Sequence, residues 1–274
     1  MIKKLVYFLY IGDDLTPNGY MKKYPTMKLH YNLLNYYHNV FDESVFVLSL
    51  KKELIENYDL IKQFMDSIID LGFYNVRFKI EENTDFRESK TFKEEVIEKK
   101  DNEGKLVFFG HNKGTTNEYN ESLIKLICSM YYFNLNFIDD VEHMLIGNEC
   151  AYYGFPLLNA HWNEPEATCV MPKYKYFIYG TFFWTNIDVM KEIIHNKKRE
   201  WPQMCSRFYA ENFPGNTIEF EMVGTYKNTY MLSGKNLHYD FDTAFNEYCE
   251  YAPEGEKIKN DFETFVNHIK EMSA

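Results

Sequence analysis

The sequence predicts an α/β fold in which a mostly parallel central sheet is flanked by helices. Short apolar runs of strand length alternate with helical patterns at the start of the chain, and this rhythm favours parallel strands joined by right-handed crossovers. The chain has 274 residues, of which 45% are hydrophobic. It is therefore long and apolar enough to bury a large core.

The first part of the chain supplies the strands on which this prediction rests. Apolar runs of strand length lie at residues 5–11, 45–50, 74–80 and 106–109. Helical patterns separate them at residues 26–37, 54–71 and 88–99. The second of these patterns has apolar residues on one face, as expected of a helix that covers a sheet.

The rest of the chain mixes helices, short strands and loops. Helices are predicted at residues 121–133, 137–145, 187–197 and 257–272, strands at 150–155 and 176–185, and a loop at 161–175. A helix from residue 199 is expected to end by Pro214-Gly215, because both residues disfavour a helix interior. We expect residues 1–215 to form one domain and residues 216–274 to be an extension packed on it.

Composition excludes some functions. The net charge of −11 argues against nucleic acid as a partner, since such proteins need a basic surface. An anionic ligand would need a locally basic site. No apolar stretch approaches the length of a membrane span. The five cysteines are scattered without metal-ligand spacing, so we expect reduced thiols and a cytoplasmic protein.

The turn after the fourth strand is the leading candidate site. It reads His111-Asn112-Lys113-Gly114, and ligands of open α/β sheets bind outside the carboxyl ends of the strands. Gly114 would let the backbone approach a ligand closely. The alternative is a surface turn whose polar side chains only cap a helix.

Several segments together resemble one family. They are His111-Asn112-Lys113-Gly114, Asn83 with Arg87-Glu88-Ser89-Lys90-Thr91-Phe92, Met130-Tyr131-Tyr132, Gly180-Thr181-Phe182-Phe183-Trp184 and Arg207-Phe208-Tyr209-Ala210-Glu211. In this order they resemble the motifs of a group of glycosyltransferases from large viruses and bacterial polysaccharide loci, whose turn is H-x-K-G. The resemblance covers residues 1–215. Thr181 departs from it, standing where the family has asparagine.

The resemblance implies a GT-A-like, Rossmann-type domain that moves a sugar from a UDP- or GDP-linked donor to a glycan or other acceptor. Lys113 would contact the donor diphosphate together with Asn112, and His111 would act as a ligand, hydrogen-bond donor or acid.

Further donor contacts are expected from Arg87, Glu88 and Thr91 at a helix start, and from Asp13 after the first strand. The alternatives are ordinary helix-start chemistry for the first three residues and a polar turn for Asp13.

The acceptor is expected to lie against the aromatic strand, near Gly180, Phe183 and Trp184. The alternative is that these rings belong to the core. Glu211 is the candidate base for the acceptor hydroxyl. Arg207 would hold it from one helical turn away, although such a pair can also be purely structural.

A divalent metal, Mn²⁺ or Mg²⁺, is left open. Most enzymes of the GT-A fold that the resemblance implies hold it with a D-x-D motif after the fourth strand, and none stands there. Asp240 and Asp242, preceded by His238, form a D-x-D far later in the chain. Two other functions stay open. They are a nucleotidyltransferase and a carbohydrate-binding protein of the same fold without catalysis. The oligomeric state is not predicted.

Overall fold

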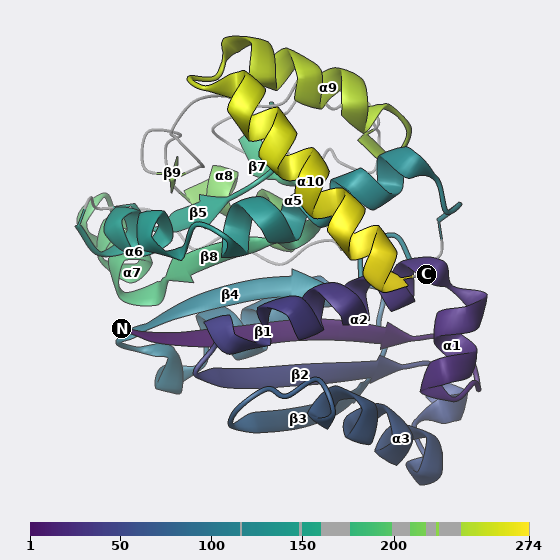
Figure 1. Cartoon of the computed structure of the whole chain (residues 1–274). Coiled ribbons are helices and arrows are strands. Elements are labelled where there is room, and N and C mark those ends of the chain that lie inside the picture. Colours follow the sequence, from purple (N-terminus) through teal and green to yellow (C-terminus); the bar gives the residue numbers. More distant parts are fainter. Residues whose placement is uncertain are drawn as a thin grey trace.

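A computed structural model describes residues 1–115, 117–147, 150–159, 176–198, 209–217, 223–224 and 237–273. The predicted α/β class is confirmed: a central sheet has the strand order β3-β2-β1-β4-β8-β5-β9, with helices packed against it (Figure 1). The strands are β1 (Ile2–Ile11), β2 (Glu43–Leu50), β3 (Val76–Glu82), β4 (Lys105–His111), β5 (Tyr152–Gly154), β6 (Leu157–Asn159), β7 (Tyr176–Ile178), β8 (Phe183–Asn186) and β9 (Val223–Gly224).

The predicted strands of the first part of the chain form one parallel block. β1 pairs in parallel with β2 on one side and β4 on the other, and β2 pairs in parallel with β3. The chain thus builds outward from β1 to β3 and then returns to add β4 on the opposite side of β1. The strand order reverses between β1 and β4. Figure 1 shows the arrowheads of β1, β2 and β4 pointing to one side of the molecule, where α1 (Pro17–Lys23) lies.

The second part of the sheet is mixed, because β8 runs antiparallel to both its neighbours, β4 and β5. The prediction of one aromatic strand over residues 176–185 is wrong. The run breaks at Gly180, whose φ is +73°. Residues before the break form β7, which pairs with β6 in a separate two-stranded sheet, and residues after it form β8.

The helices are α1, α2 (Pro25–Tyr37), α3 (Tyr58–Ile69), α4 (Glu88–Thr91), α5 (Glu121–Leu135), α6 (Ile138–Gly147), α7 (Ile187–Asn196), α8 (Tyr209–Thr217), α9 (Leu237–Tyr251) and α10 (Gly255–Ser273). α4 continues as a π-helix (Phe92–Ile97), so the helix predicted at residues 88–99 is not regular. α8 runs through Pro214, which corrects the predicted stop. α9 was not predicted, and the predicted loop at 161–175 lies outside the described residues.

Alternating side chains of β1 supply the two faces of the core. Leu5, Tyr7 and Leu9 pack with residues of α2, α3, α5, α9 and α10. Val6 and Phe8 pack on the other face with the π-helix, α7 and α8. Such period-2 alternation is what a strand buried on both faces requires.

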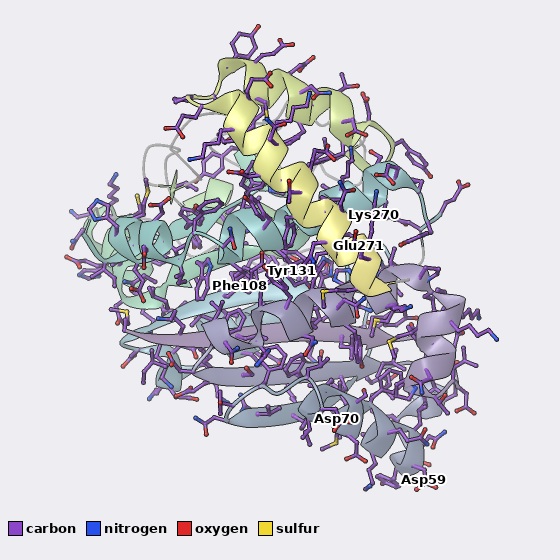
Figure 2. All side chains as sticks on the ribbon, viewed as in Figure 1. Asp59, Asp70, Phe108, Tyr131, Lys270 and Glu271 are labelled. Carbon is purple, nitrogen blue, oxygen red and sulfur yellow. The ribbon has the colours of Figure 1, made fainter. Side chains whose placement is uncertain are left out.

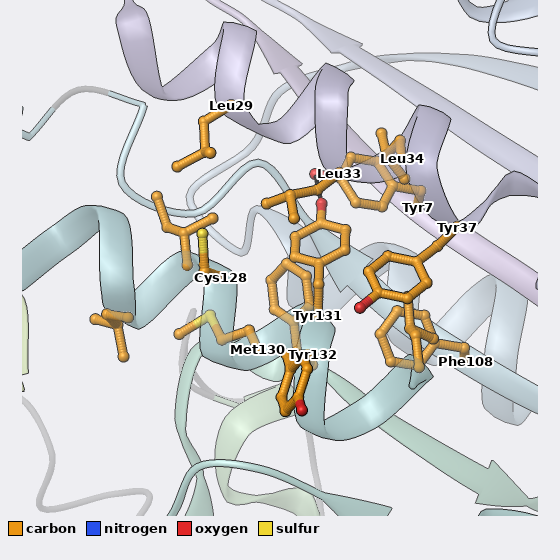
Figure 3. Close-up of a cluster of buried hydrophobic side chains, with 14 of the residues drawn as sticks. Tyr7, Leu29, Leu33, Leu34, Tyr37, Phe108, Cys128, Met130, Tyr131 and Tyr132 are labelled. Carbon is orange, nitrogen blue, oxygen red and sulfur yellow. Dashed lines mark hydrogen bonds between the residues drawn. The ribbon is translucent and has the colours of Figure 1, made fainter. Parts of the chain in front are cut away.

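The interior between the sheet and α5 is aromatic. Figure 2 shows Phe108 and Tyr131 inside the molecule, whereas Asp59, Asp70 and Glu271 lie on its outside. Figure 3 shows this cluster from close by, with side chains of α2 facing those of α5. Burying a large apolar side chain fully contributes about 1.5–3 kcal/mol, so this face is a major source of stability.

The C-terminal helices belong to the same core. Side chains of α9 and α10 are part of the cluster on the α5 face, and α10 crosses in front of α2 and α5 in Figure 1. Lys125 of α5 forms ion pairs with Asp242 of α9, at 2.8 Å, and with Glu263 of α10, at 2.9 Å. The two helices are therefore joined to α5 by charge as well as by apolar packing.

Candidate functional site

The turn after β4 places Lys113 just beyond the end of the sheet. His111 is the last residue of β4, and the Lys113 N–H donates to the His111 carbonyl at 2.8 Å. Gly114 has φ +75°, and a Cβ there would lie 2.9 Å from Cδ1 of Leu123. Only glycine satisfies both conditions without strain, so this glycine is required by the turn itself.

The amine of Lys113 pairs with Glu211 of α8. Their Nζ and Oε1 atoms are 3.2 Å apart, and 18% of the Lys113 side chain is exposed against 5% of Glu211. The same Oε1 accepts the Gly180 N–H at 3.1 Å. The predicted partner of Glu211, Arg207, lies outside the described residues. The structure thus brings together Lys113, Glu211 and Gly180 from three distant motifs.

Glu88, the first residue of α4, completes this group of charges. It is partly exposed, and loss of solvent raises its pKa to about 7, against the lowering effect of the Lys113 charge and with the help of the Glu211 charge. The Ala210 N–H donates to Oγ of Ser89 at 3.2 Å, which fixes α4 against α8. Arg87, at the start of α4, is exposed and has φ +47°, an unusual conformation for a residue with a Cβ.

His111 lies beside these charges as a buried ring. Only 8% of it is exposed. Burial lowers its pKa well below the ordinary value, and the Lys113 charge lowers the pKa further. The imidazole is therefore neutral at pH 7, and its predicted role at the donor stays a prediction. Its Nε2 is buried and makes no hydrogen bond within the described part of the chain.

Three residues predicted to contact the donor use their side chains elsewhere. Asn112 hydrogen-bonds the Tyr10 backbone through both its amide oxygen, at 3.0 Å, and its amide nitrogen, at 3.1 Å. Thr91 is fully buried and donates to Glu81 at 3.0 Å. Asp13 pairs with Lys23 at 2.9 Å. Each of these side chains thus satisfies a structural partner, and a contact with the donor stays a prediction for all three.

For Phe183 and Trp184 the structure agrees with the alternative, in which these rings belong to the core, and not with a contact at the surface. Both rings are fully buried. Trp184 packs against Phe41 and Phe108 and donates its Nε1–H to the Asn134 carbonyl at 2.7 Å. Phe183 belongs to the core cluster on the opposite face. Of the acceptor residues in the aromatic run, Gly180 is the one that the structure places at the site.

The two carboxylates of the late D-x-D lie in different surroundings. Asp242 is paired with Lys125, and Asp240 is exposed. His238 lies in α9, but its side chain is outside what the structure describes. Among the described side chains, no group of three or more His, Cys, Asp or Glu comes together in a way that could hold a metal ion.

Sequence reasoning missed His30 of α2, which lies directly beneath the turn. Its Nε2 is 2.8 Å from the Lys113 carbonyl oxygen, and the ring is fully buried. A signal was present: His30 follows Met27 by three residues and precedes Leu34 by four, so it lies on the apolar face of a predicted helix. A polar residue there needs a buried partner.

Comparisons with known proteins add no family to this picture. No protein-family model matches the chain, and no curated protein matches it. Among the described helices, none combines the length and the apolar composition needed to cross a membrane. Cys128, Cys150 and Cys249 are free and buried, whereas Cys169 and Cys205 lie outside the described residues.

Proposed function

We propose that this chain is a GT-A-like glycosyltransferase that moves a sugar from a nucleotide-diphosphate donor to a glycan or other acceptor. One observation carries the proposal. Lys113, a cation held by a buried carboxylate, lies just past the end of β4, at the place where the strand order reverses between β1 and β4. In open α/β sheets, ligands bind outside the carboxyl ends of the strands at this reversal.

The charges near this place suit a diphosphate. Departure of a nucleoside diphosphate develops negative charge, which positioned cations stabilise. Lys113 and Arg87 both lie close enough to His111 to lower its pKa, so two cations converge on one region. Glu211 is paired with Lys113, and Glu88, with a pKa of about 7, is only partly ionised at neutral pH. The balance of these four groups is therefore slightly positive in a chain of net charge −11, which favours an anionic ligand over a cationic one.

The carboxylates divide into two roles in this proposal. Oε1 of Glu211 accepts hydrogen bonds from Lys113 and Gly180, so Glu211 positions the amine and the adjoining turn. Glu88 has a pKa of about 7, which is the range where a general base exchanges protons efficiently at neutral pH. We therefore assign removal of the acceptor proton to Glu88, in place of the predicted Glu211. No step is assigned to a metal.

A thermal-shift panel of UDP- and GDP-sugars, with and without Mn²⁺ or Mg²⁺, tests the proposal. A true donor at about one hundred times its Kd stabilises the folded state by about 2.7 kcal/mol. Lys113→Ala should lose this shift. Lys125→Ala, which removes a paired lysine on the α9 and α10 side of α5, should keep it.

Turnover is then measured as release of UDP or GDP from the stabilising compound. The proposal is wrong if no nucleotide sugar stabilises the wild-type protein, or if Lys113→Ala binds the donor as tightly as wild type does. Stabilisation by free sugars alone would instead indicate the carbohydrate-binding function.

A further inference from the structure

The backbone of Lys113 is held from beneath by a buried histidine. Nε2 of His30 lies 2.8 Å from the Lys113 carbonyl oxygen. A carbonyl only accepts hydrogen bonds, so Nε2 must carry the proton in this contact. The His30 ring is fully buried, and burial lowers its pKa to about 4. The imidazole is therefore neutral at pH 7, with its proton on Nε2 and a lone pair on Nδ1.

Two tyrosines complete the contact from the other side of the ring. Nδ1 of His30 lies 2.9 Å from the hydroxyl of Tyr131 and 3.1 Å from that of Tyr7. The two hydroxyls are 3.0 Å apart. One hydroxyl can donate to Nδ1 while the other donates to its neighbour, so the fixed tautomer suits every atom of the group. Figure 3 shows Tyr7 and Tyr131 within the cluster formed by α2 side chains.

His30 and Tyr131 also pack against the segment that carries Gly180, whose N–H is the second hydrogen-bond donor to Glu211. His30 stacks on Phe182 with ring centres 6.3 Å apart, and Tyr131 packs on the same ring at 5.1 Å. Phe182 follows Gly180 by two residues. The side chains of β1, α2 and α5 thus support both segments that hydrogen-bond to Glu211, namely the Lys113 turn and the Gly180 turn.

The stability of the core alone does not explain why His30, Tyr7 and Tyr131 form a polar group inside it. Buried polar networks lose the hydration of each member and are satisfied only when every partner is present. All three side chains lie inside an apolar cluster, where apolar residues of similar volume would also pack. What the three side chains provide is a defined direction for the Lys113 carbonyl, which His30 binds.

We propose that His30, supported by Tyr7 and Tyr131, is a positioning residue that fixes the Lys113 turn and so aims the Lys113 amine at the donor diphosphate. This inference rests on the proposed function, because the ligand is the diphosphate assigned there. It adds a residue that would touch no substrate and acts through the Lys113 backbone.

Three variants separate positioning from packing. Glutamine has an amide N–H at about the reach of Nε2, so His30→Gln should keep the bond to Lys113, whereas His30→Leu removes it. Tyr31→Phe is the matched control, since it removes a buried tyrosine hydrogen bond of the same helix, to Ser67 at 3.0 Å, on the side toward α3. Should His30→Leu not fold, Tyr131→Phe replaces it, because it removes the nearer of the two hydroxyls that face Nδ1 and leaves the ring in place.

The first measurement is the Kd of UDP or GDP by calorimetry. We expect His30→Leu to weaken binding about tenfold or more, the size of effect typical of residues that support a binding group. His30→Gln and Tyr31→Phe should stay within about threefold of wild type. Equal weakening in His30→Leu and Tyr31→Phe would overturn the inference.

The second measurement needs no ligand. Hydrogen exchange of amides 111–115 should be faster in His30→Leu than in wild type, and unchanged in His30→Gln and Tyr31→Phe. Unchanged exchange in His30→Leu overturns the positioning role, whatever the binding data show. Faster exchange in a protein whose wild type binds no nucleotide supports the positioning role while the proposed function fails.

Discussion

Nζ of Lys113 lies 3.2 Å from Oε1 of Glu211, a residue 98 positions later in the chain. The same oxygen accepts the N–H of Gly180 at 3.1 Å. One carboxylate oxygen thus joins the turn after β4, the break between β7 and β8, and α8. Because Glu211 is almost fully buried, the strength of this junction is set by the protein rather than by solvent.

Neutralising Glu211 should destabilise the protein. Glu211→Gln removes the buried carboxylate that the Lys113 amine is paired with, and we expect a loss of about 1–3 kcal/mol in the free energy of unfolding. Glu263→Gln removes one partner of the more exposed Lys125 pair and should cost less than about 1 kcal/mol. Urea unfolding measures both. Equal losses in the two variants would show that the Glu211 pair is an ordinary surface contact.

Gly180 should tolerate no side chain. Its φ of +73° disfavours alanine, and an added Cβ would lie 2.5 Å from Cε of Met130. We expect Gly180→Ala to cost about 2–4 kcal/mol, from backbone strain and overpacking together. Gly104→Ala is the control, since Gly104 has φ +72° but nothing within 4 Å, and should cost about 1 kcal/mol. Similar losses at both positions would remove the role of Met130.

Glu88 should make stability depend on pH. Its pKa is raised to about 7, so between pH 4.5 and 7 the folded state keeps a proton that the unfolded state has released. Stability from this group is therefore present at low pH and lost as the pH rises through this range. As the pH rises from 4.5 to 8, we expect the free energy of unfolding of Glu88→Gln to increase by about 1–3 kcal/mol relative to that of wild type. Urea unfolding at a series of pH values measures this difference. A pH-independent difference would contradict this.

His30 should give the opposite pH dependence. Burial lowers its pKa to about 4, so between pH 6.5 and 4 the unfolded state binds a proton that the folded state refuses. The contribution of the neutral His30 to the free energy of unfolding is complete above pH 6.5. It decreases by up to about 3 kcal/mol as the pH falls toward 4. His30→Gln should flatten this part of the stability profile. The titration of the ring can be followed directly by NMR, and a pKa near 6.5 would contradict the burial effect.

The fold could be predicted because it follows from local periodicity. The runs of β1, β2 and β4 are apolar in a way that only strands buried on both faces are, and the structure extends each of them by a few residues. The direction of β8 could not be predicted, since the aromatic run that contains it looks the same in either orientation. The run breaks at Gly180, which has φ +73°, has Met130 where a side chain would stand, and donates its N–H to Glu211.

The candidate site could be predicted only in part. The turn carrying Lys113 was found because polar residues abruptly follow an apolar strand. The partner of Lys113 could not be predicted, because the sequence favours a pair between Glu211 and its neighbour Arg207, whereas the structure pairs Glu211 with Lys113. The sequence does not decide whether Phe183 and Trp184 contact a sugar or belong to the core, because aromatic side chains serve both purposes equally well. The partner of Glu211 and the burial of the two rings depend on contacts between residues far apart in the sequence, and such contacts leave no local sequence pattern.

The orientation of β8 has a consequence for how the site is assembled. If β8 ran parallel to β4, the C-terminal end of β8 would lie at the edge of the sheet where β1 and β4 end. The residues that precede β8 would then lie at the opposite edge. β8 spans four residues, roughly 13 Å at about 3.3 Å per residue, so Gly180 would then be out of reach of Lys113. Because β8 runs antiparallel to β4 and β5, the residues that precede it lie at the site, and those that follow it do not. The reversed strand is thus what carries an N–H group from the middle of the chain to the carboxylate beside the lysine.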